Sequence, residues 1–317
     1  MYKVSIIIPT YNCAHTIERT LNSIVAQTHK NLQILVIDDG STDDTLQIIK
    51  QIADNRIELH TIAHRGISHA RNTGLQYVTG DFILFIDGDD TIAHHYVTDI
   101  LALHDEHGKD MVVTGYLRPL YNFNPDAYKN QEEKEEKEAF DIVPFREVKV
   151  SQSILTQKSD VYRLLNFDLF APIFNKLYKK TIIEEFNIRF DNTIGNFFED
   201  ELFNLHYFSH ISSIAIIDAC YYYADINKQP KPEIFGYNPN GLLGITKLIR
   251  EYDAFLTTAF MQNTDCTLLI KNLLVRKIKM VVNNILIMPD STIPQKIQYI
   301  EDILNNPEFM ELVQSCG

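Results

Sequence analysis

The N-terminal third of the chain alternates short, wholly apolar segments with amphipathic ones, and this alternation constrains the fold more than any other feature. The apolar segments are Val4–Ile8, Leu32–Ile37, Ile57–Ile62 and Phe82–Ile86. Apolar residues recur at helical spacing between them, over Ala14–Ala26, Asp43–Ala53 and Ser68–Val78. Short apolar strands separated by helices predict a mostly parallel sheet covered on both faces. This is a doubly wound, Rossmann-like α/β arrangement, in which ligands bind at the carboxyl ends of the strands.

The middle of the chain differs in composition from this first part. Met111–Thr114 is a further strand candidate. The segment at about 118–150 holds the mixed-charge run Gln131–Glu138, which is typical of a solvated helix or loop. We interpret this segment as an insertion or an acceptor-side flap. We expect Ser151–Ile188, which follows it, to be mostly helical.

The remainder of the chain is expected to end in helices. A helix is predicted over Asn196–His210 and a strand over Ile214–Tyr223. Beyond them, apolar residues recur three and four positions apart in Leu242–Phe260, Cys266–Ile287 and Ile293–Leu312. We therefore divide the chain into an α/β domain over residues 1–235 and a helical C-terminal subdomain over residues 236–317.

Candidate ligand-binding residues follow the predicted strands at the edge of the sheet where the carboxyl ends meet. They are Pro9, Thr10 and Tyr11 after the first strand, Asp39 after the second, Gly66 and Arg71 after the third, and Asp87, Gly88, Asp89 and Asp90 after the fourth. An aromatic ring, a single carboxylate, an arginine and an acidic cluster are thus expected to converge.

The acidic cluster Asp87–Asp90 is the sharpest chemical signal. Carboxylates this close together repel one another unless a cation lies among them. Oxygen ligands with a permissive glycine suit Mg²⁺ or Mn²⁺, which can bridge the two phosphates of a nucleotide sugar. The plain alternative is a solvated turn, since Asp and Gly are common turn residues.

The other strand-end residues suggest how a nucleotide would be held. Asp39 could accept the N–H of a uracil ring beside Tyr11, or it could be an ordinary aspartate that stabilises a turn or caps a helix. Arg71 could face a diphosphate near a helix start, with Gly66 allowing close approach, or it could lie on the surface. A general base for an acceptor hydroxyl is expected among the carboxylates of Phe198–Phe203. An acidic helix start favoured by the macrodipole is the alternative there.

Composition narrows the classes of function. The chain has 29 basic and 42 acidic residues, a net charge of −13, which argues against nucleic acid as a partner. The four cysteines lack paired spacing, so neither a disulfide framework nor a zinc site is expected. The apolar run before Pro9 is too short for a signal peptide, and no run is long enough to span a membrane. We expect a soluble cytoplasmic protein.

Six motifs in order and register resemble those of family 2 glycosyltransferases with the GT-A fold. They are PTYN at 9–12, DDGSTDDT at 38–45, GISHARNTGL at 66–75, FIDGDD at 85–90, NKLY at 175–178 and EDELF at 199–203. The resemblance covers roughly residues 3–225. It implies an inverting transferase that uses a UDP-sugar together with Mn²⁺ or Mg²⁺.

The resemblance also implies roles for individual residues. Uridine would be held by Pro9, Thr10, Tyr11 and Asp39, and Arg71 would lie near the base or the phosphates. Asp89 would bind the metal, and Asp87 would contact the ribose or a metal-bound water. Asp200 would be the catalytic base, and Asn175 and Lys176 would lie near the sugar or the acceptor. Two departures leave details open. Phe174 stands where members often carry Trp, and the chain lacks the Tyr-Arg pair expected after the later strand at Tyr223.

We therefore expect transfer of a hexose or N-acetylhexosamine from UDP to a hydroxyl of a glycan, lipid-linked or protein-linked acceptor. Two alternatives use the same residues. One is a haloacid-dehalogenase-like phosphatase with Asp87 as nucleophile and Asp89 as acid–base, and the other is a sugar-nucleotide or glycan-binding module without turnover. The helix over 268–288 carries four basic residues suited to a membrane surface, but its apolar circumference favours burial or a homo-oligomer interface.

Overall fold

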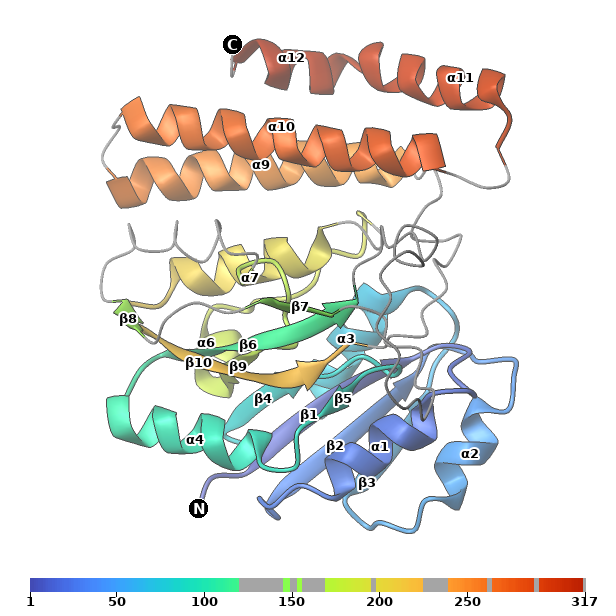
Figure 1. Ribbon diagram of the computed structural model, residues 1–317, viewed down its shortest axis with the longest axis vertical. Coiled ribbons are helices and arrows are strands. Elements are labelled where there is room, and N and C mark those ends of the chain that lie inside the picture. The colour runs from blue at the N-terminus through green and yellow to red at the C-terminus, as the bar shows by residue number, and fades with distance from the viewer. Residues whose placement is uncertain are drawn as a thin grey trace, which may run out of the picture.

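The computed structural model describes residues 1–119, 145–148, 153–155, 169–194, 198–224, 239–260, 264–287 and 291–315. Its strands form one sheet in the order β3-β2-β1-β4-β9-β6-β10-β5, with β7 beside β6 and β8 beside β10 (Figure 1). Their bounds are β1 Val4–Thr10, β2 Leu32–Asp38, β3 Ile57–Thr61, β4 Phe82–Phe85, β5 Thr91–Ile92, β6 Met111–Pro119, β7 Phe145–Val148, β8 Ser153–Leu155, β9 Lys176–Lys179 and β10 Ile214–Tyr223.

The first four strands form the expected parallel core. In register, β1 pairs with β2 on one side and with β4 on the other, and β2 pairs with β3. Every residue of β1, β2 and β4 is buried, which explains why these strands lack a polar alternation. Thr10 pairs with Asp38 at the carboxyl ends of β1 and β2, so the strand-end residues do gather at one edge.

The expectation that Ser151–Ile188 is mostly helical was wrong for the residues of that segment that the structure describes, 153–155 and 169–188. The described part of that segment contains β8, β9 and only one short helix, α6 Lys180–Glu185. Strand β9 lies antiparallel between β4 and β6, where Leu177 and Tyr178 are buried against both neighbours. The whole sheet is therefore mixed, with the predicted parallel arrangement confined to β1–β4 and the β6–β10 pair.

The helices are α1 Ile17–Val25, α2 Thr45–Gln51, α3 Ile67–Gln76, α4 Tyr96–His107, α6, α7 Glu199–Ser209, α9 Pro239–Phe260, α10 Thr264–Ile287, α11 Ile293–Leu304 and α12 Pro307–Ser315. In Figure 1, α1 and α4 lie in front of the sheet, α9 and α10 lie side by side above α7, and α11 and α12 form a further layer. The expected helical C-terminal region, including its interruption near Pro307, is confirmed. The proposed boundary at 235/236 lies outside the described residues, as does most of the expected flap at 118–150.

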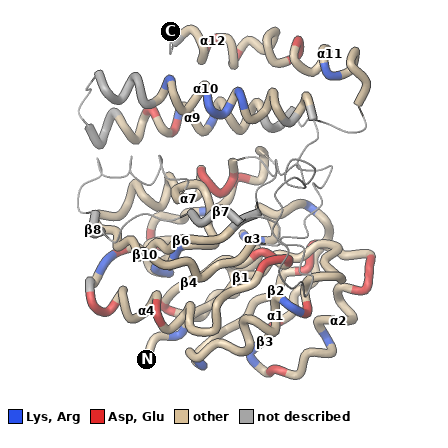
Figure 2. The backbone as a smooth tube through the Cα atoms, in the orientation of Figure 1, with Lys and Arg blue, Asp and Glu red and all other residues tan. Residues whose placement is uncertain are grey.

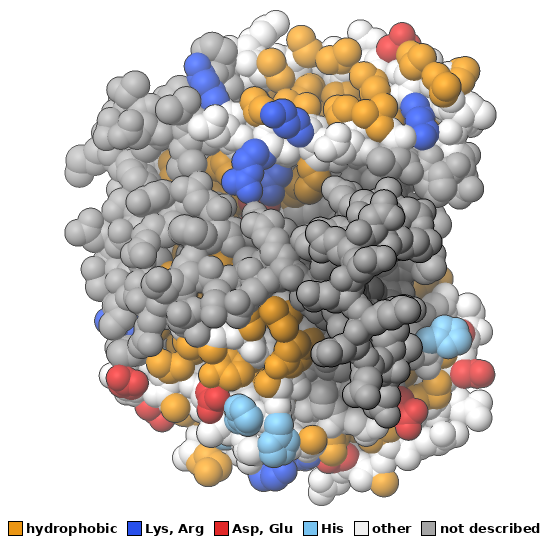
Figure 3. All heavy atoms as spheres, in the orientation of Figure 1, with side chains coloured by type: hydrophobic (Ala, Val, Ile, Leu, Met, Phe, Trp, Pro, Cys, Tyr) orange, Lys and Arg blue, Asp and Glu red, His pale blue; other side chains and the backbone are white. Residues whose placement is uncertain are grey.

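Hydrophobic side chains gather on the surface over the C-terminal helices (Figure 3). The large exposed ones on α10 and α11 are Val275, Met280, Leu286, Ile293, Ile297 and Leu304. None of the helices in the described ranges is long and apolar enough to cross a membrane. The homo-oligomer interface expected on these helices stays a prediction.

Candidate active site

The loops that follow β1 and β2 are hydrogen-bonded to each other at the strand-end edge. The Asp39 N–H donates to the Thr10 carbonyl at 2.8 Å. The Asn12 N–H donates to the Ser41 hydroxyl at 2.9 Å, and the Thr42 N–H donates to Asn12 Oδ1 at 2.8 Å. Asn12 has a φ of 50°, a left-handed conformation that asparagine tolerates better than most residues. These bonds make the two loops one unit.

Asp39 organises the segment that leads into α3. Its carboxylate is nearly buried and accepts the N–H of Arg65 at 2.9 Å and of Gly66 at 2.8 Å. Gly66 has a φ of 93° and a ψ of 168°, a conformation open essentially to glycine alone. The glycine expected here to permit close approach is thus required by the backbone itself.

His64 is a site residue that the sequence analysis did not single out. Its Nδ1 lies 2.8 Å from Asp39 Oδ2, and its ring stacks on Tyr11 with a centroid separation of 4.1 Å. The imidazole therefore joins Tyr11 to Asp39, the two residues expected at a nucleobase. Its position two residues before Gly66 was the only signal that the sequence offered.

Gly88 explains how the acidic cluster fits against the first strand. A Cβ added at Gly88 would lie 3.0 Å from Thr10 Cγ2 and 3.1 Å from the Pro9 carbonyl oxygen. The Gly88 carbonyl accepts hydrogen bonds from the hydroxyls of Thr16, which directly precedes α1, and of Thr20 on α1. Pro9 and Thr10 thus contact the cluster directly, which holds its backbone in place.

The aspartates of the cluster have different surroundings. Asp90 is 2% exposed and accepts a hydrogen bond from the Tyr222 hydroxyl at 2.5 Å. Phe174, which departs from the Trp of the resembled motif, stacks on Tyr222 at a centroid separation of 4.0 Å and supports it. Asp87 and Asp89 are only partly buried, so their carboxylates are the ones that solvent and ligands can reach.

These two carboxylates fit the divalent cation expected from the sequence. Oxygen-only ligands suit Mg²⁺ and Mn²⁺, and Mg²⁺ in particular is usually held by one or two carboxylates, with water and phosphate oxygens completing its shell. Within the described residues, no three His, Cys, Asp or Glu side chains form a metal-binding group. Asp87 and Asp89 are thus the candidate metal ligands among the described residues, and further ligands would come from the substrate and water.

Arg71 connects the acidic cluster to α7. Its side chain is 2% exposed, and Nη2 donates to Asp87 Oδ1 at 3.0 Å. Nη1 donates to Asp200 Oδ1 at 2.5 Å and to Glu199 Oε1 at 3.2 Å. Burial alone would lower the Arg71 pKa, but the three carboxylates raise it above its usual value. The guanidinium is therefore permanently charged, and its expected contact with the donor stays a prediction.

The acidic start of α7 holds the candidate general base. Burial raises the pKa of Glu199 to about 8, and the neighbouring Asp200 charge adds to this rise against the opposing effect of Arg71. Burial also raises the pKa of Asp200 despite its ion pair with Arg71. Raised proton affinity suits a carboxylate that must accept a proton near neutral pH.

Lys176, which was expected beside the sugar or the acceptor, lies in the protein interior. The residue is fully buried, and its ammonium donates to the Leu169 carbonyl, the Pro172 carbonyl and Asn175 Oδ1. Burial lowers its pKa well below the usual value. In this structure Lys176 stabilises the loop before β9, and its contact with a donor remains untested.

Comparisons with known proteins agree with this arrangement. The sequence model described as Glycosyl transferase family 2 matches residues 5–186. Glycosyltransferase GlyA of Streptococcus pneumoniae is 33% identical over 207 residues, which cover 64% of this chain and 27% of that protein. The UDP-Glc:alpha-D-GlcNAc-diphosphoundecaprenol beta-1,3-glucosyltransferase WfgD of Escherichia coli is 46% identical over 90 residues, or 28% of this chain and 36% of that protein. The chain thus spans well under half the length of these curated relatives.

A solved structure shares the fold. The crystal structure of S. aureus TarS 1–349 in complex with UDP-GlcNAc has a TM-score of 0.66 and 22% sequence identity. The match covers 95% of this chain and 79% of the other. It confirms the expected GT-A type of α/β fold with a helical C-terminal region.

Proposed function

The chain belongs to glycosyltransferase family 2, and from that premise we propose that it transfers a hexose or N-acetylhexosamine from a UDP-sugar to an acceptor hydroxyl, with inversion. The observation that carries the proposal is the bridge made by Arg71. One arm of its guanidinium bonds to Asp87 in the acidic cluster, and the other bonds to Asp200 at the start of α7. A candidate metal site and a candidate base thus lie on opposite sides of one buried cation.

The uridine would bind at Tyr11 and Asp39. The Tyr11 ring can stack on a base, and the Asp39 carboxylate can accept the N–H of uracil. A UDP donor is supported by WfgD, a glucosyltransferase that uses UDP-Glc, and by the TarS complex with UDP-GlcNAc.

A divalent cation, Mn²⁺ or Mg²⁺, would be held by Asp89 with support from Asp87. When bound, such a cation neutralises the charge of the leaving diphosphate. Its requirement fits the anionic character of the chain, whose net charge is −13, because the diphosphate is itself an anion. Arg71 supplies the fixed positive charge next to that site.

Asp200 would take the proton from the acceptor hydroxyl. In a single displacement with inversion, the acceptor attacks the anomeric carbon from the face opposite the UDP, so the base must stand across from the diphosphate. The placement of Arg71 between Asp200 and Asp87 supports this role for Asp200. Burial raises the pKa of both Glu199 and Asp200, so this pair of carboxylates has the raised proton affinity that suits a base near neutral pH.

The acceptor class remains open among glycan, lipid-linked and protein-linked hydroxyls. WfgD acts on a diphosphoundecaprenol-linked sugar, and TarS is a poly(ribitol-phosphate) transferase, so relatives differ in this respect. The phosphatase alternative is not favoured, because family membership accounts for the α/β strands that precede Asp87. The cytoplasmic location expected from the sequence stays a prediction.

The proposal is tested by measuring UDP binding and UDP release. Purified protein is screened with several UDP-sugars and Mn²⁺ or Mg²⁺. Asp89→Ala should abolish metal-dependent UDP binding, whereas Asp200→Asn should keep UDP affinity and lower turnover roughly 10²- to 10⁴-fold. Asp105→Ala, which changes an exposed aspartate of α4, serves as the matched control.

Three results would contradict the assignment. Metal-dependent UDP binding of unchanged strength in the Asp89 variant would remove the metal site from the cluster. A wild type that binds UDP-sugar with metal but shows no rate dependence on Asp200 would favour the binding module without turnover. Steady hydrolysis of p-nitrophenyl phosphate, lost in Asp87→Asn, would restore the phosphatase alternative.

A further inference from the structure

Glu201, in the acidic first turn of α7, is held by the C-terminal helices. Its side chain is 5% exposed, and Oε1 accepts a hydrogen bond from the Tyr252 hydroxyl of α9 at 2.7 Å. Its Oε2 accepts a hydrogen bond from the Lys277 ammonium of α10. Because successive helical residues point about 100° apart, Glu201 faces these helices while Asp200 faces Arg71.

Lys277 also contacts the residue that precedes the helix. Its ammonium lies 4.9 Å from the centroid of the Phe198 ring, at cation–π distance. Phe198 is buried and has a φ of 67°, a left-handed conformation that is strained for an aromatic residue. One ammonium therefore contacts both residues that flank Glu199 and Asp200.

The rest of α7 is anchored independently by the α/β domain. The Asn204 amide donates to the carbonyls of Phe170 at 2.7 Å and Ala171 at 2.8 Å. The Tyr178 hydroxyl of β9 donates to Asn204 Oδ1 at 2.6 Å. Loss of the C-terminal contacts would therefore loosen the first turn of α7 and leave the remainder of the helix in place.

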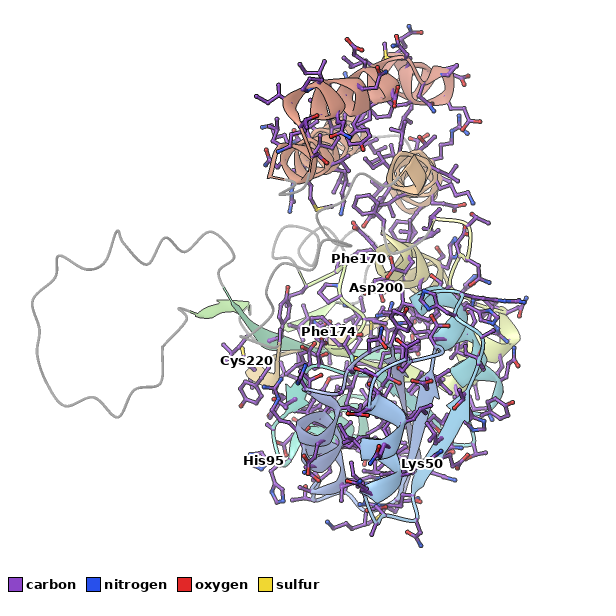
Figure 4. The ribbon with its side chains drawn as sticks, turned by 90° about the vertical axis from the view of Figure 1, so that its right-hand side faces the viewer. Lys50, His95, Phe170, Phe174, Asp200 and Cys220 are labelled. Atoms are coloured by element: carbon purple, nitrogen blue, oxygen red, sulfur yellow. The ribbon has the colours of Figure 1, made fainter. Side chains whose placement is uncertain are left out.

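Figures 2 and 4 show where the start of α7 lies relative to the C-terminal helices. In Figure 4, Asp200 lies at the junction between the α/β domain and the overlying helices. In Figure 2, the acidic start of α7 lies below a basic stretch of α10. Lys277 belongs to that stretch, and its side chain is 15% exposed, so its pairing with Glu201 is largely shielded from solvent.

We propose that Lys277 and Tyr252 are positioning residues for the catalytic turn: through Glu201 and Phe198 they hold Asp200 in its orientation toward the donor site. The inference rests on the proposed function, and it gives the C-terminal helices a part in turnover. A displacement of a catalytic group by about 1 Å can cost on the order of 100-fold in rate. The contacts of Lys277 reach Asp200 only through its neighbours, so binding of UDP should not need them.

The test compares Lys277→Met, Lys277→Arg and Tyr252→Phe with the wild type. UDP affinity is measured by calorimetry, and kcat is measured as UDP release from the UDP-sugar that the wild type turns over. Lys277→Met should lower kcat roughly 10- to 100-fold with UDP affinity within about twofold of wild type. Lys277→Arg should recover most of the rate, and Tyr252→Phe should give a smaller loss.

Lys247→Met is the matched control. Lys247 lies on α9 and pairs with Asp191 at 2.8 Å, so it also connects the C-terminal helices to the α/β domain, but at a different place. Its replacement should leave kcat unchanged. A loss of rate as large as that of Lys277→Met would show that any such connection matters and would overturn the positioning role.

A double-mutant cycle with Asp200→Asn separates positioning from general structure. If Lys277 acts through Asp200, Lys277→Met should cost nothing further in the Asp200→Asn background. An equal additional loss there would overturn the inference. Should Lys277→Met fail to fold, Tyr252→Phe decides the matter, since an unchanged kcat in that folded variant refutes the inference. Absence of UDP binding and release in the wild type would instead refute the proposed function.

Discussion

Replacing Glu199 by glutamine should make the stability of the protein less dependent on pH. Three carboxylates surround the single guanidinium of Arg71, so the group carries excess negative charge. Burial, reinforced by the charge of Asp200, raises the pKa of Glu199 to about 8. Glutamine resembles the protonated acid in size and charge, and it cannot ionise in either the folded or the unfolded state.

The sign and size of the effect follow from proton linkage. Between the unfolded pKa of 4.5 and the folded pKa of about 8, the folded protein holds a proton on Glu199 that the unfolded chain has released. The free energy of unfolding of the wild type therefore falls as pH rises through this window. At about 1.4 kcal/mol per pH unit, the wild type should lose about 2–3 kcal/mol relative to the variant between pH 5 and pH 7.

The measurement is urea unfolding of both proteins at pH 5, 6 and 7, analysed as the difference in free energy of unfolding at each pH. Histidines and surface carboxylates also titrate in this range, but they are common to both proteins and largely cancel in the difference. The difference should grow steadily in favour of Glu199→Gln as pH rises. A difference that stays constant within about 0.5 kcal/mol would refute the claim that Glu199 holds a proton in the folded state.

Three further substitutions test the donor site. Gly88→Ala places a Cβ 3.1 Å from the Pro9 carbonyl oxygen and should lower the free energy of unfolding by about 1–3 kcal/mol in a urea titration, and an unchanged midpoint would contradict the close approach. Tyr11→Ala removes the stacking ring and should weaken UDP binding about tenfold, as measured by calorimetry. Unaltered affinity would show that the uracil ring does not stack on Tyr11. Asp90→Asn keeps an acceptor for the Tyr222 hydroxyl, so metal-dependent UDP binding should persist, and its loss would make Asp90 a ligand.

The parts of the fold that were predictable from sequence are those in which neighbouring residues determine the structure. Strands β1, β2 and β4 are buried over their whole length, so each appears in the sequence as a continuous apolar run. The C-terminal helices are long enough for their period to be unmistakable. The convergence of the strand-end residues then followed from topology, because parallel strands present their carboxyl ends at the same edge.

Strand β9 shows where this reasoning failed. It has only four residues, and its sequence Lys-Leu-Tyr-Lys has no preference strong enough to specify a strand. Its conformation comes from hydrogen bonds to β4 and β6, which precede it by many residues. A window centred on Lys176–Lys179 contains neither partner, so a local pattern could not reveal the strand.

The roles within the candidate site were hidden for the same reason. Glu199, Asp200 and Glu201 are adjacent and chemically alike, so the sequence left the choice of base among them open until a family resemblance was considered. The structure distinguishes them by what each faces: Glu199 and Asp200 face Arg71, whereas Glu201 faces Lys277. His64 likewise gained its role only through its distance to Asp39.

Arg71 is the residue whose placement most changes the interpretation of the sequence. From its motif it was expected near the base or phosphates of the donor, yet its guanidinium is buried between two acidic segments that follow it by 16 and by 128–129 positions. Removing a buried cation from such a group leaves carboxylates without compensation, which is costly. Arg71 therefore sets the separation between the Asp87 and Asp200 carboxylates. The proposed site needs this separation, because one carboxylate must lie beside a cation while the other accepts a proton.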